Sequence, residues 1–182
     1  PAGTLGGGTD ASGFPGSDMG AQINAAYAAC PSTGCKIVVP PANYSFSTQI
    51  VLNTSNKPPI LQGSGSNATT LTWTGQSTST ILRSGQQGDV SMGIRDLTIS
   101  GTSTTDIAPL LELGGSPGFA YATIENVHTT KGRDGIYVGR NVYIIEFNHI
   151  LSDFNVRDFV IGSGSNSGKT LSVAGASDFG DG

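Results

Sequence analysis

The chain has 182 residues, of which 36% are hydrophobic and only 12% are charged, and its formal net charge is −4. The length allows one domain with a real core, and the absence of any Lys/Arg cluster argues against a nucleic-acid-binding protein. No apolar stretch approaches the roughly 20 residues of a membrane span. The 27 glycines, together with many Ser, Thr and Asn residues, suit short strands joined by many turns.

Residues 1–16 are rich in glycine and show no periodicity, so we expect a loose N-terminal arm. The next segment, residues 17–30, predicts a helix that covers the open edge of the strands that follow it. Ser17 is a good N-cap residue, and Asp18 lies where the helix dipole favours an anion. Apolar residues at spacings of four, three and four form one face of this helix: Met19, Ile23, Ala26 and Cys30.

Cys30 and Cys35 are the two cysteines of the chain, too few for a four-cysteine zinc site. A disulfide between them would close a small loop and contribute about 2 kcal/mol. Two free, buried thiols are the alternative. The composition resembles that of extracellular proteins, in which disulfides persist, and this favours the disulfide.

The stretch IVVPPANYSF (37–46) predicts a strand, a sharp corner and a second strand, because Pro40 and Pro41 cannot donate to a strand ladder. Short strand-forming runs continue along residues 35–182. Neither helical crossovers nor tight hairpin signals separate them, which argues against a doubly wound α/β fold and against a meander. We therefore predict an all-β fold, a parallel β-helix domain over residues 17–182 whose coils occupy residues 35–182.

Two weak internal repeats support this coiling. The first set contains IRDLTI (94–99), IENVHT (124–129) and IEFNHI (145–150), and the second set spans residues 105–115, 133–139 and 157–164. The steps are 30 and 21 residues in the first set, and 28 and 24 in the second. A coil of three short strands and their turns needs about 20 to 30 residues. Successive coils would then stack about 4.8 Å apart.

The segment GAQINAAYAACPSTGCKIVVPPANYSF (20–46), followed by PILQGSGS (59–66), resembles the N-terminal part of pectate-lyase-like right-handed parallel β-helix proteins, members of the pectin lyase superfamily. The resemblance implies a right-handed coil with a capping helix. It covers residues 17–75 well and 90–165 loosely. The superfamily includes pectate lyases and polygalacturonase-like hydrolases, and the fold also hosts epimerases and phage tailspikes. The catalytic motifs of the polygalacturonases and of the calcium-dependent pectate lyases are not evident here, so no catalytic residue carries over.

Stacking of the second repeat set suggests candidate catalytic residues. In register, Asp106, Asp134 and Asp158 would form a column with neighbours about 4.8 Å apart. Carboxylates this close suit a shared proton or a bound cation, and calcium is the cofactor that such a column would accept. Arg133 and Arg157 would neutralise the aspartates or bind a uronate carboxylate. The alternative is that each aspartate caps a turn through its own side chain.

The first repeat set suggests candidate substrate-binding residues. His128 and His149 recur at one repeat position, each three residues after a Glu, and Lys131 and Asp153 lie in the loops of the same coils. A His/Glu ladder could bind a metal or move protons, but such residues also commonly line a solvated face. Trp73 belongs to an apolar strand face, so we expect it in the core rather than against a sugar.

These features predict a secreted, extracellular β-helix protein that acts on a polysaccharide, with cleavage of acidic, pectin-like glycans by elimination or hydrolysis as the leading function. The alternatives are a non-catalytic glycan-binding or attachment module of adhesin or tailspike type, and a structural assembly protein. Residues 170–182 offer no lid comparable to the N-terminal helix. We therefore expect either a longer parent chain or self-association through the C-terminal end of the solenoid.

Overall fold

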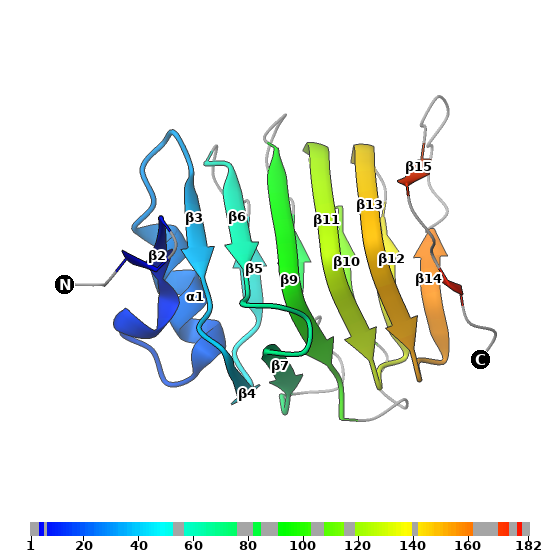
Figure 1. Ribbon diagram of the computed structural model, residues 1–182, viewed down its shortest axis with the longest axis horizontal. Coiled ribbons are helices and arrows are strands. Elements are labelled where there is room, and N and C mark those ends of the chain that lie inside the picture. The colour runs from blue at the N-terminus through cyan, green and yellow to red at the C-terminus, as the bar shows by residue number, and fades with distance from the viewer. Residues whose placement is uncertain are drawn as a thin grey trace.

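The computed structural model shows short strands wound into stacked coils (Figure 1). It describes residues 4–5, 7–52, 57–75, 82–84, 91–102, 108–114, 119–139, 142–161, 171–174 and 178–179. The elements, in chain order, are β1 (Thr4–Leu5), β2 (Gly8–Asp10), the short 3-10 helix η1 (Ala11–Gly13), α1 (Met19–Ala28), β3 (Cys35–Val38), β4 (Ala42–Phe46), β5 (Ile50–Leu52), β6 (Pro59–Gln62), β7 (Thr69–Trp73), β8 (Leu82–Ser84), β9 (Met92–Ser100), β10 (Pro109–Leu113), β11 (Phe119–Thr130), β12 (Asp134–Val138), β13 (Val142–Asp153), β14 (Arg157–Ile161), β15 (Leu171–Ala174) and β16 (Asp178–Phe179).

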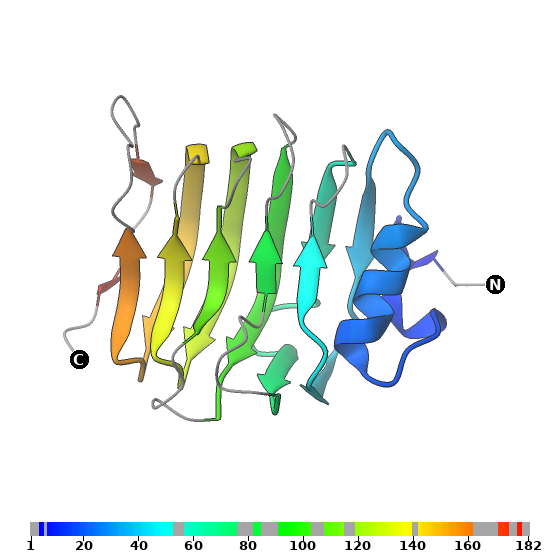
Figure 2. The same cartoon turned by 180° about the vertical axis from the view of Figure 1, so that it is seen from behind.

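The strands form two sheets. Sheet A follows the order β1-β2-β3-β6-β9-β11-β13-β15, with β4, β7 and β16 attached to it, and sheet B follows the order β14-β12-β10-β8-β5. Sheet A faces the viewer in Figure 1, and sheet B faces the viewer in Figure 2. Among the described strands, every pairing except that of β1 with β2 is parallel. The predicted all-β, parallel β-solenoid is therefore confirmed.

Inward-facing apolar residues fix the stacking of the coils. Along sheet A, aligned residues of successive strands form an inner column: Ile37, Leu61, Ile94, Ile124 and Phe147. None of these side chains is more than 3% exposed. Full burial of one such side chain contributes about 1.5–3 kcal/mol. Because a one-residue slip would turn the whole column towards solvent, this column decides which residues of neighbouring coils lie side by side.

The aromatic residues of the first coils belong to the core. Trp73 packs edge-on against Phe46, with 5.3 Å between the ring centroids, and both rings are buried. The expected core position of Trp73 is confirmed. Tyr44 is half-buried against the same core, and its hydroxyl donates to the Pro40 carbonyl at 3.2 Å. Burial and the nearby charge of Asp10 raise the pKa of Tyr44.

The long strands β9, β11 and β13 each bend at a left-handed residue. The bend residues are Asp96, Asn126 and His149, with φ of 59°, 50° and 52°. The register stacks these three positions on one another. Asp96 accepts hydrogen bonds from Asn126 Nδ2 at 2.8 Å and from Gln62 Nε2 at 3.0 Å. This ladder of polar side chains offsets the cost of a left-handed backbone, which Asn and Asp tolerate better than most residues.

Two further corner positions repeat in the same way. Tyr121 and Ile144 have φ of 62° and 51°, and the pairs on either side of them show that they lie side by side. Lys131 and Phe154 directly follow the aligned pair Thr130 and Asp153, and they have φ of 60° and 51°. The corners are thus a property of the coil rather than of any one side chain.

Helix α1 lies at the N-terminal end of the stack, next to β3, β4 and β5 (Figures 1 and 2). Its N-cap is Asp18, whose Oδ1 accepts from the Ala21 amide at 2.9 Å. Asp18 Oδ2 accepts from the amides of Ser47 and Thr48 at 2.8 and 3.0 Å. The expectation that Ser17 would be the N-cap is therefore wrong, because the carboxylate one residue later reaches both the helix and the β4–β5 turn.

A second contact joins the middle of α1 to the edge of sheet B. Asn24 Nδ2 donates to the Gln49 carbonyl at 2.8 Å, and Asn24 Oδ1 accepts from the Val51 amide at 2.9 Å. One amide side chain thus pairs with the backbone of β5, the last strand of sheet B, as a neighbouring strand would. None of the helices that the structure describes has the length and apolarity needed to cross a lipid bilayer.

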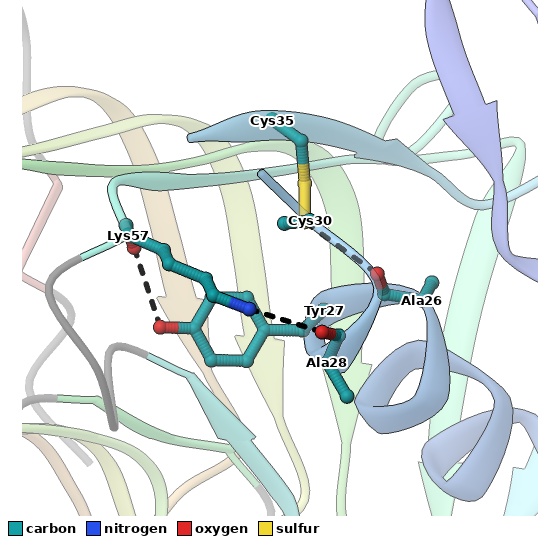
Figure 3. Close-up of a disulfide and its surroundings, with 6 residues drawn as sticks. All are labelled: Ala26, Tyr27, Ala28, Cys30, Cys35 and Lys57. Carbon is teal, nitrogen blue, oxygen red and sulfur yellow. Dashed lines mark hydrogen bonds between the residues drawn. A yellow bond between two sulfur atoms is a disulfide. The ribbon is translucent and has the colours of Figure 1, made fainter. Parts of the chain in front are cut away.

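The C-terminal end of α1 is held by a disulfide and a lysine (Figure 3). Cys30 and Cys35 form the predicted disulfide, so the alternative of two free thiols is wrong. Lys57 Nζ donates to the Ala28 carbonyl at 3.0 Å, where a cation favours the helix dipole. The Tyr27 hydroxyl donates to the Lys57 carbonyl at 3.3 Å.

Part of residues 1–16, where a loose arm is expected, forms secondary structure. Thr9 and Asp10 of β2 pair in parallel with Ile37 and Val38 of β3. Asp10 also caps η1, because its side chain accepts from the Ser12 amide at 2.9 Å. The pairing uses backbone groups of only two residues of β2, and for this reason no side-chain periodicity in the sequence indicates it.

We predict that Asp18→Ala lowers the free energy of unfolding by about 1–3 kcal/mol, because it removes a helix cap and two further backbone hydrogen bonds. Burial raises the pKa of Asp18, but the hydrogen bonds from Ala21, Ser47 and Thr48 outweigh it and hold the pKa below its ordinary value. The contribution of Asp18 is therefore present above the unfolded-state pKa of about 4, and it is lost as the pH falls through the folded-state pKa.

Urea unfolding followed by circular dichroism at neutral and acidic pH measures this effect. The control is Ser17→Ala, which we expect to change the stability little. Equal losses for the two variants, or a loss for Asp18→Ala that does not shrink in acid, would contradict this assignment.

Candidate functional site

The expected alignment of Asp134 with Asp158 is absent. Strand β12 pairs with β14 in a register that places Asp134 beside Arg157, and not beside Asp158. On the other side of Asp134 lies Pro109. The apolar pairs further along these strands set this register, because Ile136 and Phe159 must lie side by side. Asp106, the third member, lies outside the described residues.

Asp134 and Arg157 instead form a two-pronged ion pair. Arg157 Nε and Nη2 donate to Asp134 Oδ1 and Oδ2 at 2.6 and 2.8 Å. The Asp134 side chain is only 5% exposed, whereas that of Arg157 is 49% exposed. These hydrogen bonds to Asp134 raise the pKa of Arg157. The Arg133 carbonyl accepts from the Arg157 amide at 2.7 Å, so Arg133 lies at the same corner.

Asp158 belongs to a network of buried polar groups. Its Oδ1 accepts from Asn155 Nδ2 at 3.0 Å, and Asn155 Oδ1 in turn accepts from the Gly132 amide at 2.8 Å. The hydroxyls of Thr129 and Ser152 lie 2.8 Å apart in the same network. These contacts join the corner after β11 to the corner after β13, which is the turn-capping role that was the alternative for this aspartate.

The expected histidine ladder is also absent. The register places Leu151 beside His128, whereas His149 lies beside Asn126 at the bend. The repeat alignment behind the ladder set Ile145 against Ile124, but in the structure Phe147 takes that place. A shift of two residues keeps the same face inward, so the apolar pattern alone does not exclude it.

Three of the predicted substrate-binding residues nevertheless come together. His128 Nε2 lies 2.8 Å from Asp153 Oδ1, and both side chains are partly exposed. Burial raises the pKa of Asp153, but hydrogen bonds from His128 and Thr130 and the charge of Lys131 outweigh it, so that the pKa lies below its ordinary value. We call His128, Thr130, Lys131 and Asp153 the His–Asp cluster. His149 does not belong to it.

No metal site is found in the part of the chain that the structure describes. Within those residues, no three side chains of His, Cys, Asp or Glu lie close enough together to hold a metal ion.

A groove crosses the outer face of sheet A, and none of the predicted catalytic or substrate-binding residues lines it. It encloses about 470 Å³. The lining residues come from the turn before β3 and from β6, β9 and β11, with the residues just before β6 and β9: Thr33, Gly34, Cys35, Pro58, Pro59, Ile60, Ser91, Met92, Gly93, Arg95, Tyr121, Thr123 and Glu125. These strands lie next to one another in Figure 1. The groove therefore crosses several coils rather than following one strand.

Three features shape this groove. Gly93 lies between Ile60 and Thr123 in an outward-facing row and leaves the groove open where a side chain would stand. Arg95 and Glu125 are aligned on β9 and β11, with 4.0 Å between Nη1 and Oε2. Strand alternation in IRDLTI and IENVHT could have shown this pair, because both residues follow the aligned isoleucines. The turn before β3 also lines the groove, but only the folded structure shows this, because nothing in the local sequence of the turn indicates it.

The architecture and the groove define the chain as a parallel β-solenoid with a groove on its outer sheet face. No family model matches the sequence, and no curated protein matches it.

Two solved structures share the architecture. The ORF18 protein of Geobacillus virus E2 is 14% identical with a TM-score of 0.59, and the match covers 87% of this chain and 43% of that protein. The catalytic unit of a thermostable GH87 alpha-1,3-glucanase from Streptomyces thermodiastaticus strain HF3-3 is 16% identical with a TM-score of 0.57, and the match covers 81% of this chain and 27% of that one. The chain thus spans less than half the length of either protein, and these likenesses show the fold alone.

We predict that the Asp134–Arg157 pair stabilises the corner. Arg157→Met leaves the buried carboxylate without its two donors, and we expect a lower free energy of unfolding. In the double variant Asp134→Asn, Arg157→Met, most of this stability returns, because no charge stays buried. Urea titrations of the four proteins of this cycle measure the coupling. A coupling energy of zero would exclude the stabilising role.

Proposed function

We propose that the protein is an extracellular, glycan-binding β-solenoid that holds a polysaccharide in the groove of sheet A. The groove itself carries this proposal: it is a concave, largely apolar surface with a few polar groups, as in most ligand sites. Tyr121 presents an exposed aromatic ring at this surface, and such rings suit the apolar faces of sugars.

The shape of the groove suits a linear polymer. It reaches across β3, β6, β9 and β11, which are adjacent in sheet A. At about 4.8 Å between strands, four strands span about 14 Å along the axis of the stack. Hydroxyl and charged groups recur along this path at Ser91, Arg95 and Thr123. A short stretch of an extended glycan fits such a path better than a compact ligand does.

Further properties follow from the fold. The disulfide supports an extracellular location, because disulfides persist in oxidising compartments. A right-handed coil is expected because parallel connections within a sheet are right-handed in nearly all proteins. The contacts of Asp18 and Asn24 with the first coil support a capping role for α1. Among the two structural neighbours, the glucanase is a polysaccharide-active protein by its name.

A second candidate function is cleavage of an acidic, pectin-like glycan by elimination at the His–Asp cluster. With Nε2–H donated to Asp153, His128 Nδ1 is the ring nitrogen that accepts a proton. His128 would take the proton beside the uronate carboxyl group, whose charge Lys131 offsets. The electron pair forms a carbon–carbon double bond, the bond to the neighbouring sugar oxygen breaks, and water protonates that oxygen. Hydrolysis by the aspartate column loses its support, because Asp134 and Asp158 are not aligned.

We predict that Gly93→Leu fills the groove and weakens glycan binding about tenfold or more. The atoms nearest to a Cβ at Gly93 belong to the Ile60 side chain, at 3.5 Å and beyond, so a Cβ makes ordinary contacts there. The matched control is Glu146→Leu, which adds the same side chain to the same outward row beyond the groove. Calorimetry with a panel of neutral and acidic polysaccharides measures the affinities. Equal affinities of both variants and the wild type would exclude the groove as the binding site.

We predict for the second candidate that the wild type releases unsaturated products from polygalacturonate, detected by their ultraviolet absorbance. His128→Ala should then lower the rate about 100-fold or more, because it removes the base. His149→Ala, which alters the histidine outside the cluster, should leave the rate unchanged. A wild type without unsaturated products from any uronan would exclude this function and leave the binding proposal intact.

A further inference from the structure

The charges that line the groove balance one another. Arg95 and Glu125 are the charged members of the lining among the described residues, and they stand side by side. Just outside the groove, Lys36 and Glu146 lie in the row that contains Gly93, one of each sign. A polyanion would therefore meet the Glu125 carboxylate wherever it approached Arg95. This arrangement does not favour a chain of uronates, because an uncompensated cation is what binds carboxylates best.

The Arg95–Glu125 pair suits hydroxyl groups instead. The guanidinium only donates hydrogen bonds and the carboxylate only accepts them, whereas a sugar hydroxyl does both. At 4.0 Å the two groups form a long contact, and their side chains stay 38% and 42% exposed. Neighbouring hydroxyls on one sugar could thus bond to both partners at once. Such a site rejects ligands that lack the hydroxyls, because its polar groups would lose water without replacement.

Tyr121 supplies the apolar contact for the same ligand. Its side chain is 56% exposed and lines the groove beside Thr123 and Glu125 of the same strand. Its left-handed backbone is shared with Ile144 in the next coil, so the corner itself does not depend on the tyrosine. The identity of the side chain at this corner therefore decides what the groove offers to a sugar face.

We infer that the groove takes a neutral glycan, with Tyr121 stacking on a sugar face and the Arg95–Glu125 pair reading neighbouring hydroxyls. This inference rests on the proposed function and names the substrate class of the same site. It differs from the acidic glycans that the second candidate requires, so one panel of polysaccharides tests both.

The first experiment changes the charge of the pair. The wild type should bind a neutral glucan, mannan or galactan at least about tenfold more tightly than polygalacturonate or alginate. Glu125→Gln leaves the Arg95 charge uncompensated. It should raise the affinity for the two uronans about tenfold at low salt and lower the affinity for the neutral glycan. The matched control Glu146→Gln removes the same charge outside the groove and should change neither affinity by that amount.

The second experiment removes the aromatic ring and keeps the corner. Tyr121→Asn fits because asparagine tolerates a left-handed backbone. It should weaken binding of the neutral glycan about fivefold to tenfold. The control is Ile144→Asn, the same change at the aligned corner outside the groove, which should leave the affinity unchanged. Circular dichroism confirms that both variants keep the fold.

The outcomes separate this inference from the proposed function. If the wild type binds no glycan of the panel, the proposed function fails and the inference fails with it. If uronans bind more tightly than neutral glycans and Gly93→Leu abolishes that binding, the groove is confirmed and the neutral preference is wrong. Weaker neutral binding in Tyr121→Asn but not in Ile144→Asn, together with a shift of preference towards the uronans in Glu125→Gln, supports the inference.

Discussion

The structure depends on one constraint, the inner column of Ile37, Leu61, Ile94, Ile124 and Phe147 in sheet A. Each member must point inward, and the pleat then turns the residues on either side of it outward. The apolar requirement of the core thereby decides which polar side chains become neighbours on the surface. Arg95 meets Glu125 because Ile94 meets Ile124. The arrangement of side chains in the groove is therefore a consequence of how the core packs.

Much of the fold could be predicted from the sequence, because its signals are local. The turn at Pro40 and Pro41, the helix before the strands and the disulfide each depend on residues close together in the chain. The register between coils is different, because it joins residues more than twenty positions apart. Alignment of the similar segments 133–139 and 157–164 placed Asp134 against Asp158, although the pairing of Ile136 with Phe159 fixes a different register. Aligning inward apolar residues rather than repeated dipeptides would have avoided this error.

The candidate sites show the same difference between what local sequence signals predict and what depends on the register between coils. The partnership of His128 with Asp153 is diagonal across two strands, so that no repeat alignment displays it. The alignment of IRDLTI with IENVHT is correct and places Arg95 beside Glu125, so this pair could be predicted from the sequence. The wall formed by Thr33 and Gly34 could not be foreseen, because it depends on where a turn lies against another coil.

The left-handed corners also bear on how such a chain can change its size. Corner positions such as those of Tyr121 and Ile144 repeat from coil to coil, and the two coils share one backbone path there. A whole coil is therefore an interchangeable module: duplication of one coil would preserve every neighbour relation on either side of the insertion. Each added module would lengthen the outer face by about 4.8 Å. Evolution could in this way change the length of the outer face without redesigning any one coil.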